Sequence, residues 1–449
     1  MSTELKEKFG LFTAIAMVVG IVIGSGVFFK AEKVLTATGG NLPIGILAWV
    51  IGGIIMIACA YTFAVMATRY EYVNGVVDYA EATMGKKYAY FVGWFMAIIY
   101  YPTLTSVLAW ISARYTAVLI GWDITGAQCM TLAGFFLIAS YALNALSPVL
   151  AGKFQVATTV IKLVPLLLMA IVGTIVGLSN GMTVQNFSTA VTEVDTFTAL
   201  FIAVCATSFA YEGWIIATSI NAELRNSKKN LPIALVVGTF IIMLVYIFYY
   251  IGLAGAVPNE TMMAGGEAGA KLAFETIFSK LGGSLIFVFV IISCLGTLNG
   301  LMLGCTRGIY SVAARGRGPK AKMFAQVDKV TNMPTNSSIL GLLFAGAWLL
   351  FFFGANLTEP WFGFFCFDSS ELPIVTLYAA YIPIFIMLMK KERDLPAFKR
   401  FIMPAVAILG CLFMILAACF SHRLAVVAYL AVFAVVMIVG AFFVKQKEI

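Results

Sequence analysis

The chain carries about twelve apolar stretches, each long enough to cross a lipid bilayer, and this pattern limits the possible folds more than any other feature. A helix needs roughly 20 predominantly apolar residues to span the hydrocarbon core. Because 61% of the 449 residues are hydrophobic and 11% are charged, a soluble globular fold is excluded. We therefore expect an all-α polytopic membrane protein with transmembrane helices near residues 11–37, 42–68, 88–119, 128–146, 154–178, 197–220, 231–252, 282–312, 338–354, 361–389, 401–420 and 424–444.

The charged residues indicate the orientation of these helices. If the N-terminus is cytoplasmic, most lysine and arginine residues fall in inside segments, as the positive-inside rule requires. Both termini are therefore expected in the cytoplasm, with the chain crossing the plasma membrane many times. This placement also accounts for the net charge of +8. The expected partner of the basic residues is thus the lipid bilayer and not nucleic acid.

Enzyme chemistry has little support in the sequence. The single histidine, His422, argues against histidine-based metal sites and a Ser-His-Asp triad. The eight cysteines form no Cys-x-x-Cys pair, and the sequence contains no Walker loop or Gly-x-Ser-x-Gly motif. We therefore predict no catalytic residue, no metal and no cofactor, and we do not expect ATP-driven transport.

Glycine interrupts two of the apolar stretches, at residues 20–26 in the first and at residues 209–214 in the sixth. Backbone groups in hydrocarbon must be hydrogen-bonded, so a mid-membrane break persists only where it is buried in protein or lines a watery cavity. Broken helices at corresponding points of the two halves are typical of a transporter binding site near the midplane. The alternative for the first segment is close helix packing through small residues.

The expected chemistry of the two breaks follows from their free backbone groups. The N–H groups of Ser25 and Gly26 would open a new half-helix, whose positive dipole end favours a carboxylate. Carbonyls released near Val22, Phe209 and Glu212 would attract a cation. One site would thus offer donors for a carboxylate and acceptors for an ammonium, which is the polar outline of an α-amino acid.

Three segments in combination resemble the L-type amino-acid transporter branch of the amino acid, polyamine and organocation superfamily. They are residues 23–28, residues 209–214, and residues 296–300 followed by Arg307 and the turn at 315–319. The resemblance covers nearly the whole chain, and bacterial alanine-serine-cysteine exchangers are closest in character. It implies a LeuT-type 5+5 inverted repeat with broken helices 1 and 6. The expected boundaries are 1–180 for the first five-helix repeat, 197–390 for the second, and 400–449 for two additional C-terminal helices.

The same resemblance implies a substrate site made largely of backbone groups. Ser25 and Gly26 match positions whose N–H groups hold the substrate carboxylate, and the ring of Phe209 matches an aromatic gate. Val22, Phe209 and Glu212 match positions whose carbonyls take the amine. The full set of expected substrate-binding residues is Val22, Gly24, Ser25, Gly26, Phe209, Ala210, Glu212 and Gly213.

Lys162 is the most informative charge within a predicted span, because an ionisable residue there is costly and usually functional. In the resembling family a lysine at this position replaces the second sodium of sodium-coupled relatives and tethers the first helix to the eighth. Lys162 is therefore expected to have a coupling or conformational role. Two alternatives remain open: a buried lysine can exchange protons, and a lysine can also snorkel to a lipid headgroup.

Three acidic residues have open roles. Glu212 departs from the human L-type pattern, and it could attract the substrate ammonium, bind lysine or tyrosine groups as an inner gate, or cap freed amides. Asp368 and Glu371 are expected on one face of the tenth helix. They could form a hydrogen-bond network of the outer vestibule or take part in proton transfer. The same helix is expected to bring Phe364, Phe365 and Phe367 to the pocket.

These observations favour a sodium-independent antiporter that exchanges small neutral L-amino acids, such as alanine, serine and cysteine, by alternating access. A proton-coupled symporter that uses Lys162 is the main alternative. A channel would need a continuous polar lining, and a receptor would need a folded signalling domain, so both are less favoured. The loop at residues 120–128 has no cysteine, so we expect no disulfide-linked heavy subunit.

Overall fold

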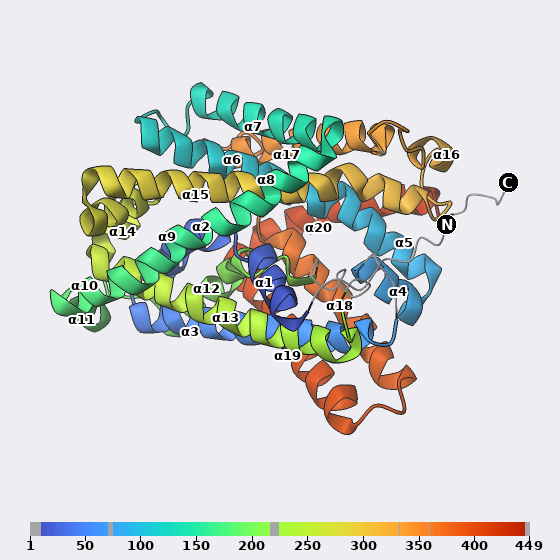
Figure 1. Cartoon of the computed structure of the whole chain (residues 1–449), viewed down its shortest axis with the longest axis horizontal. Helices are drawn as coiled ribbons and strands as arrows, with labels where there is room; N and C mark the ends of the chain where they lie inside the picture. The colour runs from blue at the N-terminus through green and yellow to red at the C-terminus, as the bar shows by residue number, and fades with distance from the viewer. Residues whose placement is uncertain (1–9, 71–74, 216–223, 332, 358, 445–449) are drawn as a thin grey trace. The chain divides into compact units, whose positions relative to one another are not determined.

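The computed structural model describes residues 10–70, 75–215, 224–331, 333–357 and 359–444, and regular structure within these ranges is almost entirely helical (Figure 1). In the described ranges, ten helices are long and apolar enough to cross a membrane. They are Leu42–Ala67, Lys86–Ile120, Ala127–Leu146, Pro148–Ser179, Ser227–Ala256, Glu267–Ala313, Thr335–Ala355, Leu372–Lys391, Phe398–His422 and Leu424–Phe442. Each one corresponds to a predicted span, which confirms the all-α polytopic class.

The two other predicted spans are the ones that glycine was expected to interrupt. The first is divided into α1 (Leu11–Val22) and α2 (Gly26–Ala37), with three residues between them. The sixth contains α12 (Thr196–Ala210), which ends in a turn. Both interruptions are therefore confirmed, and they lie at the glycine-containing segments because glycine stabilises a helix less than other residues do.

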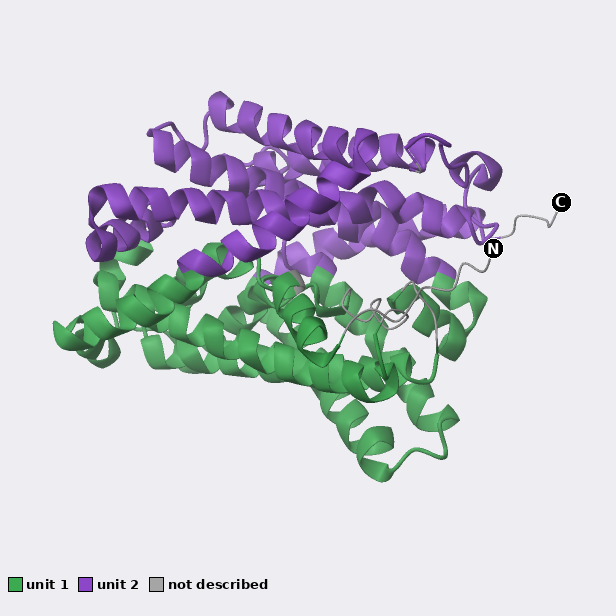
Figure 2. Cartoon of the chain, viewed as in Figure 1, with its two compact units in different colours: residues 1–89, 166–263, 374–421 green, residues 90–165, 264–373, 422–449 purple. Residues whose placement is uncertain are grey.

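The chain folds into two compact units, and each is assembled from separate stretches of sequence (Figure 2). Unit 1 comprises residues 1–89, 166–263 and 374–421, and unit 2 comprises residues 90–165, 264–373 and 422–449. Both units therefore take helices from both halves of the chain. The predicted five-helix repeats are continuous ranges of the sequence, so they are a different division from these two units. The boundaries of the repeats stay a prediction.

Unit 1 contains both helix breaks, and α13 packs against α1 and α3 within it. The ring of Trp49 lies edge-on to Tyr211 and Tyr246, with centroids 5.6 and 5.7 Å away. The Tyr211 hydroxyl donates a hydrogen bond of 2.8 Å to the Trp49 carbonyl. These buried contacts join α3, α12 and α13 beside the breaks. The helices of this unit, in whole or most part, are α1, α2, α3 (Leu42–Ala67), α4 (Val76–Met84), α10 (Thr174–Ser179), α11 (Met182–Ser188), α12, α13 (Ser227–Ala256), α14 (Asn259–Gly265), α18 (Leu372–Lys391) and α19 (Met403–His422).

A buried amide network lies inside unit 2. The Asn144 side-chain nitrogen donates to the Asn299 side-chain oxygen at 2.9 Å, and the Asn299 nitrogen donates to Gln155 Oε1 at 3.2 Å. Because buried amides are costly unless they are hydrogen-bonded, this network favours one arrangement of α7, α8 and α15. The helices of unit 2, in whole or most part, are α5 (Lys86–Phe95), α6 (Tyr101–Ile120), α7 (Ala127–Leu146), α8 (Pro148–Ile161), α15 (Glu267–Ala313), α16 (Ala321–Phe324), α17 (Thr335–Ala355) and α20 (Leu424–Phe442).

The predicted tenth span begins eleven residues later than expected, at Leu372. An irregular segment precedes it, in which Gly363 has a φ of +51° and Asp368 accepts a hydrogen bond of 2.7 Å from the Ser370 N–H. This side-chain acceptor closes a local turn in place of a helical turn. Asp368 and Glu371 therefore do not share a helix face, and that prediction was wrong. Phe364, Phe365 and Phe367 also precede the tenth helix, so their predicted place in it was wrong; Phe364 and Phe365 are exposed, and Phe367 is buried.

Candidate functional site

The first break presents a buried helix start. Ile23 leaves the helical conformation, with φ −63° and ψ 112°, and α2 begins at Gly26. The first N–H groups of a helix have no acceptor within that helix. Ser25, at the N-cap, is fully buried, and its hydroxyl has no hydrogen-bond partner among the described residues. The break therefore gathers backbone donors and one hydroxyl at the positive end of α2.

The second break presents a buried helix end. The Tyr211 N–H still donates to the Thr207 carbonyl at 3.1 Å, after which the chain turns. Gly213 has a φ of +106°, a conformation that glycine adopts readily and other residues rarely do. The last carbonyls of α12 therefore have no donor within the helix. The expected continuation of the sixth helix at residues 216–220 lies outside the described residues.

The two breaks are in direct contact inside unit 1. A Cβ atom added to Gly26 would lie 2.5 Å from Ala210 Cα and 3.1 Å from the Phe209 carbonyl oxygen. The rings of Phe29 and Phe209 pack edge-on, with centroids 6.0 Å apart. The structure thus brings the N-terminal end of α2 against the C-terminal end of α12, and no residue other than glycine fits at position 26 without movement of the backbone.

Tyr246 connects the two breaks, and it is not among the site residues predicted from the sequence. Its hydroxyl, on α13, lies 3.1 Å from the Ala210 carbonyl oxygen and 3.3 Å from that of Val22, within donating distance of both. Tyr246 is fully buried, and a buried tyrosine hydroxyl normally has a hydrogen-bond partner. The signal in the sequence was a tyrosine in the middle of an apolar stretch, although nothing indicated which helix it would reach.

Of the eight expected substrate-binding residues, all lie in unit 1, at or beside the two breaks. Val22 and Ala210 supply the carbonyls that face Tyr246, whereas Gly24, Ser25 and Gly26 lie at the start of α2. A helix start favours negative charge and a helix end favours positive charge. The arrangement can therefore hold the two opposite charges of a small dipolar molecule with main-chain groups.

Lys162 is buried between α8 and α9 (Leu163–Leu168), with 2% of its surface exposed. Its N–H donates to the carbonyl of Thr158 at 3.0 Å, one helical turn earlier. A Cβ atom added to Gly296 of α15 would lie 2.6 Å from the Thr158 Cβ, so α8 and α15 approach closely on this face. Burial within protein argues against a lysine that snorkels to a headgroup. The tether to the first helix stays a prediction.

Lys30 is a second buried lysine, and it is not among the site residues predicted from the sequence. It is fully buried in α2, one turn after Gly26 and on the same face. Its ammonium lies 5.0 Å from the ring centroid of Phe29 and 5.5 Å from that of Phe209. Aromatic faces attract cations, so the ammonium contributes to the position of both rings. The signal was a charge inside the first apolar stretch.

Glu212 lies in the turn of the second break. It is close enough to Tyr378 and Tyr381 of α18, and to Cys59 of α3, to act on them electrostatically. The ring of Tyr381 also packs against Trp214, with centroids 6.0 Å apart. The Tyr381 hydroxyl has no hydrogen-bond partner among the described residues, and the role of Glu212 stays a prediction.

Glu371 pairs with the only histidine of the chain. The Nε2 atom of His422 lies 3.0 Å from Glu371 Oε2, and both side chains are largely buried in unit 2. Asp368 Oδ1 accepts hydrogen bonds from the Ser370 N–H and hydroxyl, in the turn before the tenth helix. The predicted joint action of Asp368 and Glu371 therefore has no support from the helix geometry on which it was based.

The membrane helices and the two contacting breaks define a membrane transporter with discontinuous helices. The solved structure of MhsT in complex with L-phenylalanine has this LeuT-type fold. It matches 98% of this chain and 100% of its own chain, with a TM-score of 0.56 and 13% sequence identity. The predicted fold is therefore confirmed.

The family model described as "Amino acid permease" matches residues 9–443, so the chain belongs to the amino acid permease family. The serine/threonine exchanger SteT of Bacillus subtilis (strain 168) is 32% identical over 338 residues, which are 74% of this chain and 75% of that protein. The b(0,+)-type amino acid transporter 1 of Mus musculus is 25% identical over 424 residues, 94% of this chain and 84% of that protein. The resemblance stated from the sequence is confirmed, and the chain belongs to a family of multi-pass membrane transporters of amino acids.

Proposed function

We propose that this protein is a sodium-independent antiporter that exchanges small neutral L-amino acids, such as alanine, serine and cysteine, across the plasma membrane. The observation that carries the proposal is the contact between Gly26 and Ala210, which joins a helix start to a helix end in one buried place. The name of the similar serine/threonine exchanger supports both exchange and a small polar or neutral substrate.

In the proposed complex, the N–H groups at Gly24, Ser25 and Gly26 bind the substrate carboxylate, with the Ser25 hydroxyl as a further donor. The carbonyls near Val22, Phe209, Ala210, Glu212 and Gly213 bind the amine. A helix start and a helix end stabilise these opposite charges. Because the contacts are made by main-chain groups, they recognise the part that all α-amino acids share, and selectivity depends on space around the side chain.

Sodium independence is proposed from Lys162. A buried ammonium supplies a fixed positive charge in the membrane interior, where a bound sodium ion would be repelled by it. If Lys162 instead gained and lost a proton during transport, the protein would be a proton-coupled symporter. The proposal also keeps both termini in the cytoplasm and expects no disulfide-linked heavy subunit.

The direct test is uptake into proteoliposomes. Vesicles loaded with unlabelled alanine are expected to take up labelled alanine rapidly in sodium-free buffer, because exchange requires an internal partner amino acid. Empty vesicles are expected to take up little. Uptake by empty vesicles that depends on a proton gradient would replace the antiporter with the symporter, and an absolute requirement for sodium would contradict the role given to Lys162.

Replacement of Tyr246 with phenylalanine is expected to slow exchange by about tenfold while the protein stays folded. The change removes a hydroxyl that reaches both breaks, and a buried acceptor that loses its partner typically costs about 1 to 3 kcal/mol. Initial rates of alanine exchange measure the effect. Tyr250→Phe is the matched control, since Tyr250 is buried on the same helix and also packs near Trp49. Equal rates for the two variants would contradict a special role of Tyr246.

A further inference from the structure

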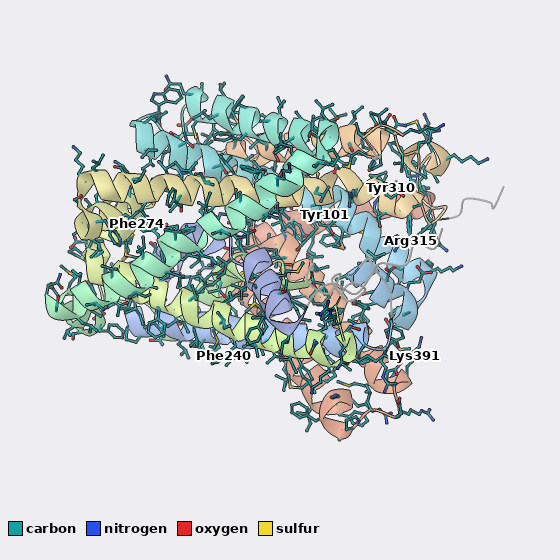
Figure 3. All side chains as sticks on the ribbon, viewed as in Figure 1. Tyr101, Phe240, Phe274, Tyr310, Arg315 and Lys391 are labelled. Carbon is teal, nitrogen blue, oxygen red and sulfur yellow. The ribbon has the colours of Figure 1, made fainter. Side chains whose placement is uncertain are left out.

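The link between α18 and α19 lies at a membrane surface. The helices on both sides, Leu372–Lys391 and Phe398–His422, are candidate membrane spans. Residues 392–397 alone connect them, so the chain has no room to leave the surface between the two crossings. We name residues 390–402 the α18–α19 link. It projects from the other helices of unit 1 in Figure 2, and Figure 3 labels Lys391 at this place.

The link carries five basic residues and two acidic ones, and the acidic ones are already engaged within unit 1. The Arg69 guanidinium donates a hydrogen bond to Asp394 and holds the pKa of that carboxyl below its ordinary value. Glu392 accepts a hydrogen bond of 2.7 Å from the Tyr70 hydroxyl and lies 3.8 Å from Arg69. The negative charges of the link therefore do not neutralise its own lysine and arginine residues.

The five basic residues divide into two groups. Lys391 donates to the Ala82 carbonyl at 3.0 Å, and Arg400 donates to the Met389 carbonyl at 2.8 Å. The side chains of Lys390, Arg393 and Lys399 are exposed, and no hydrogen bond or ion pair joins these side chains to the described part of the chain. Three cations are thus available to an anion outside the protein.

Apolar side chains are exposed next to these cations. About half of the surface of Phe398, Phe401 and Ile402 is exposed, and the Arg400 guanidinium lies 4.5 Å from the Phe401 ring centroid. Aromatic and apolar groups beside lysine and arginine are typical of the boundary between acyl chains and headgroups. A segment that only faced water would gain nothing from exposing three large apolar side chains.

We propose that the α18–α19 link is a binding site for an anionic phospholipid. Lys390, Arg393 and Lys399 bind the phosphate of the headgroup, and Phe398, Phe401 and Ile402 contact the start of the acyl chains. The combination of free cations with exposed apolar side chains is what selects a lipid over a soluble anion, because an inorganic anion would use the cations alone.

The test uses the purified full-length protein in detergent, with native mass spectrometry to count bound phosphatidylglycerol or phosphatidylcholine. The wild-type protein is expected to retain phosphatidylglycerol in preference to phosphatidylcholine. The triple variant K390Q/R393Q/K399Q is expected to bind it at least about tenfold more weakly, since each basic residue near the surface contributes to attraction of anionic lipid. Phe398→Ala is expected to weaken the binding of both lipids, because it removes a contact with the acyl chains.

The matched control is the variant K320Q/K322Q/K329Q, which removes the same number of charges from three exposed lysines in unit 2. It is expected to bind phosphatidylglycerol as the wild type does. Equal binding by K390Q/R393Q/K399Q and the wild type, or an equal loss in both triple variants, would overturn the proposal. Displacement of the lipid by excess inorganic phosphate would assign the link to soluble anions instead and would also overturn it. Thermal unfolding of each variant checks that the fold is retained.

Discussion

Replacement of Gly26 with alanine is expected to abolish measurable exchange, with a loss of at least about 30-fold in initial rate. The added Cβ would lie 2.5 Å from Ala210 Cα, a backbone atom that cannot rotate away. Helices α2 and α12 must then separate, and overpacking of this kind costs about 1 to 3 kcal/mol. Every donor at the start of α2 would move relative to the acceptors at the end of α12. Alanine exchange in proteoliposomes measures the loss.

Gly134→Ala is the control for this change. Gly134 lies in the helix α7, and a Cβ added there would meet no atom within 4 Å. Alanine is the better helix former, so this variant is expected to exchange alanine within about twofold of the wild-type rate. Wild-type exchange by Gly26→Ala would show that the two breaks are not held in the contact described, and the proposed substrate site would then be wrong.

Replacement of Lys162 with methionine is expected to lower the exchange rate at least about tenfold, because an ionisable residue buried in a membrane helix is usually functional. The side chains are similar in length, so the change removes the charge and keeps most of the packing. An apolar residue at a buried ionic position often leaves stability unchanged or raises it. Slow exchange combined with a normal or higher melting temperature would therefore separate a functional role from a structural one.

Lys153→Met provides the comparison on the same helix. Lys153 is an exposed residue of α8, nine positions before Lys162, and its replacement is expected to change the rate by no more than about twofold. Measurement of exchange at several pH values extends the test, since a proton carrier at Lys162 would make the wild-type rate depend on the proton gradient. Normal exchange by Lys162→Met would remove both the tether and the proton-carrier hypotheses.

Much of the fold could be predicted from the sequence because membrane helices are defined locally. A span needs only a sufficient run of apolar residues, and a break needs only residues that weaken the helix within such a run. The ten candidate spans and the interruptions at residues 23–25 and after Ala210 follow from these two local properties. The start of the tenth span was predicted too early for a reason that is also local: the Asp368 turn precedes the helix, although the aromatic residues before that turn are as apolar as a helix requires.

The candidate site could be predicted only in part. The residues of the breaks were identified, because glycines within apolar stretches mark them in the sequence. Tyr246 and Lys30 were missed, because a tyrosine or a lysine within an apolar stretch does not indicate which helix it will contact. The same holds for Glu371 and His422, which pair at 3.0 Å although 51 positions separate them.

By itself, the sequence determined that this protein is a helical membrane protein, that two of its helices are discontinuous, and that its family transports amino acids. Tertiary structure alone decided that Gly26 lies against Ala210, that one hydroxyl of Tyr246 reaches both breaks, and that Lys30 is buried over Phe29 and Phe209. The physical reason is the separation along the chain of the residues that interact. Helix formation depends on residues within a few turns of one another, whereas a binding site depends on packing between helices that are distant in the chain.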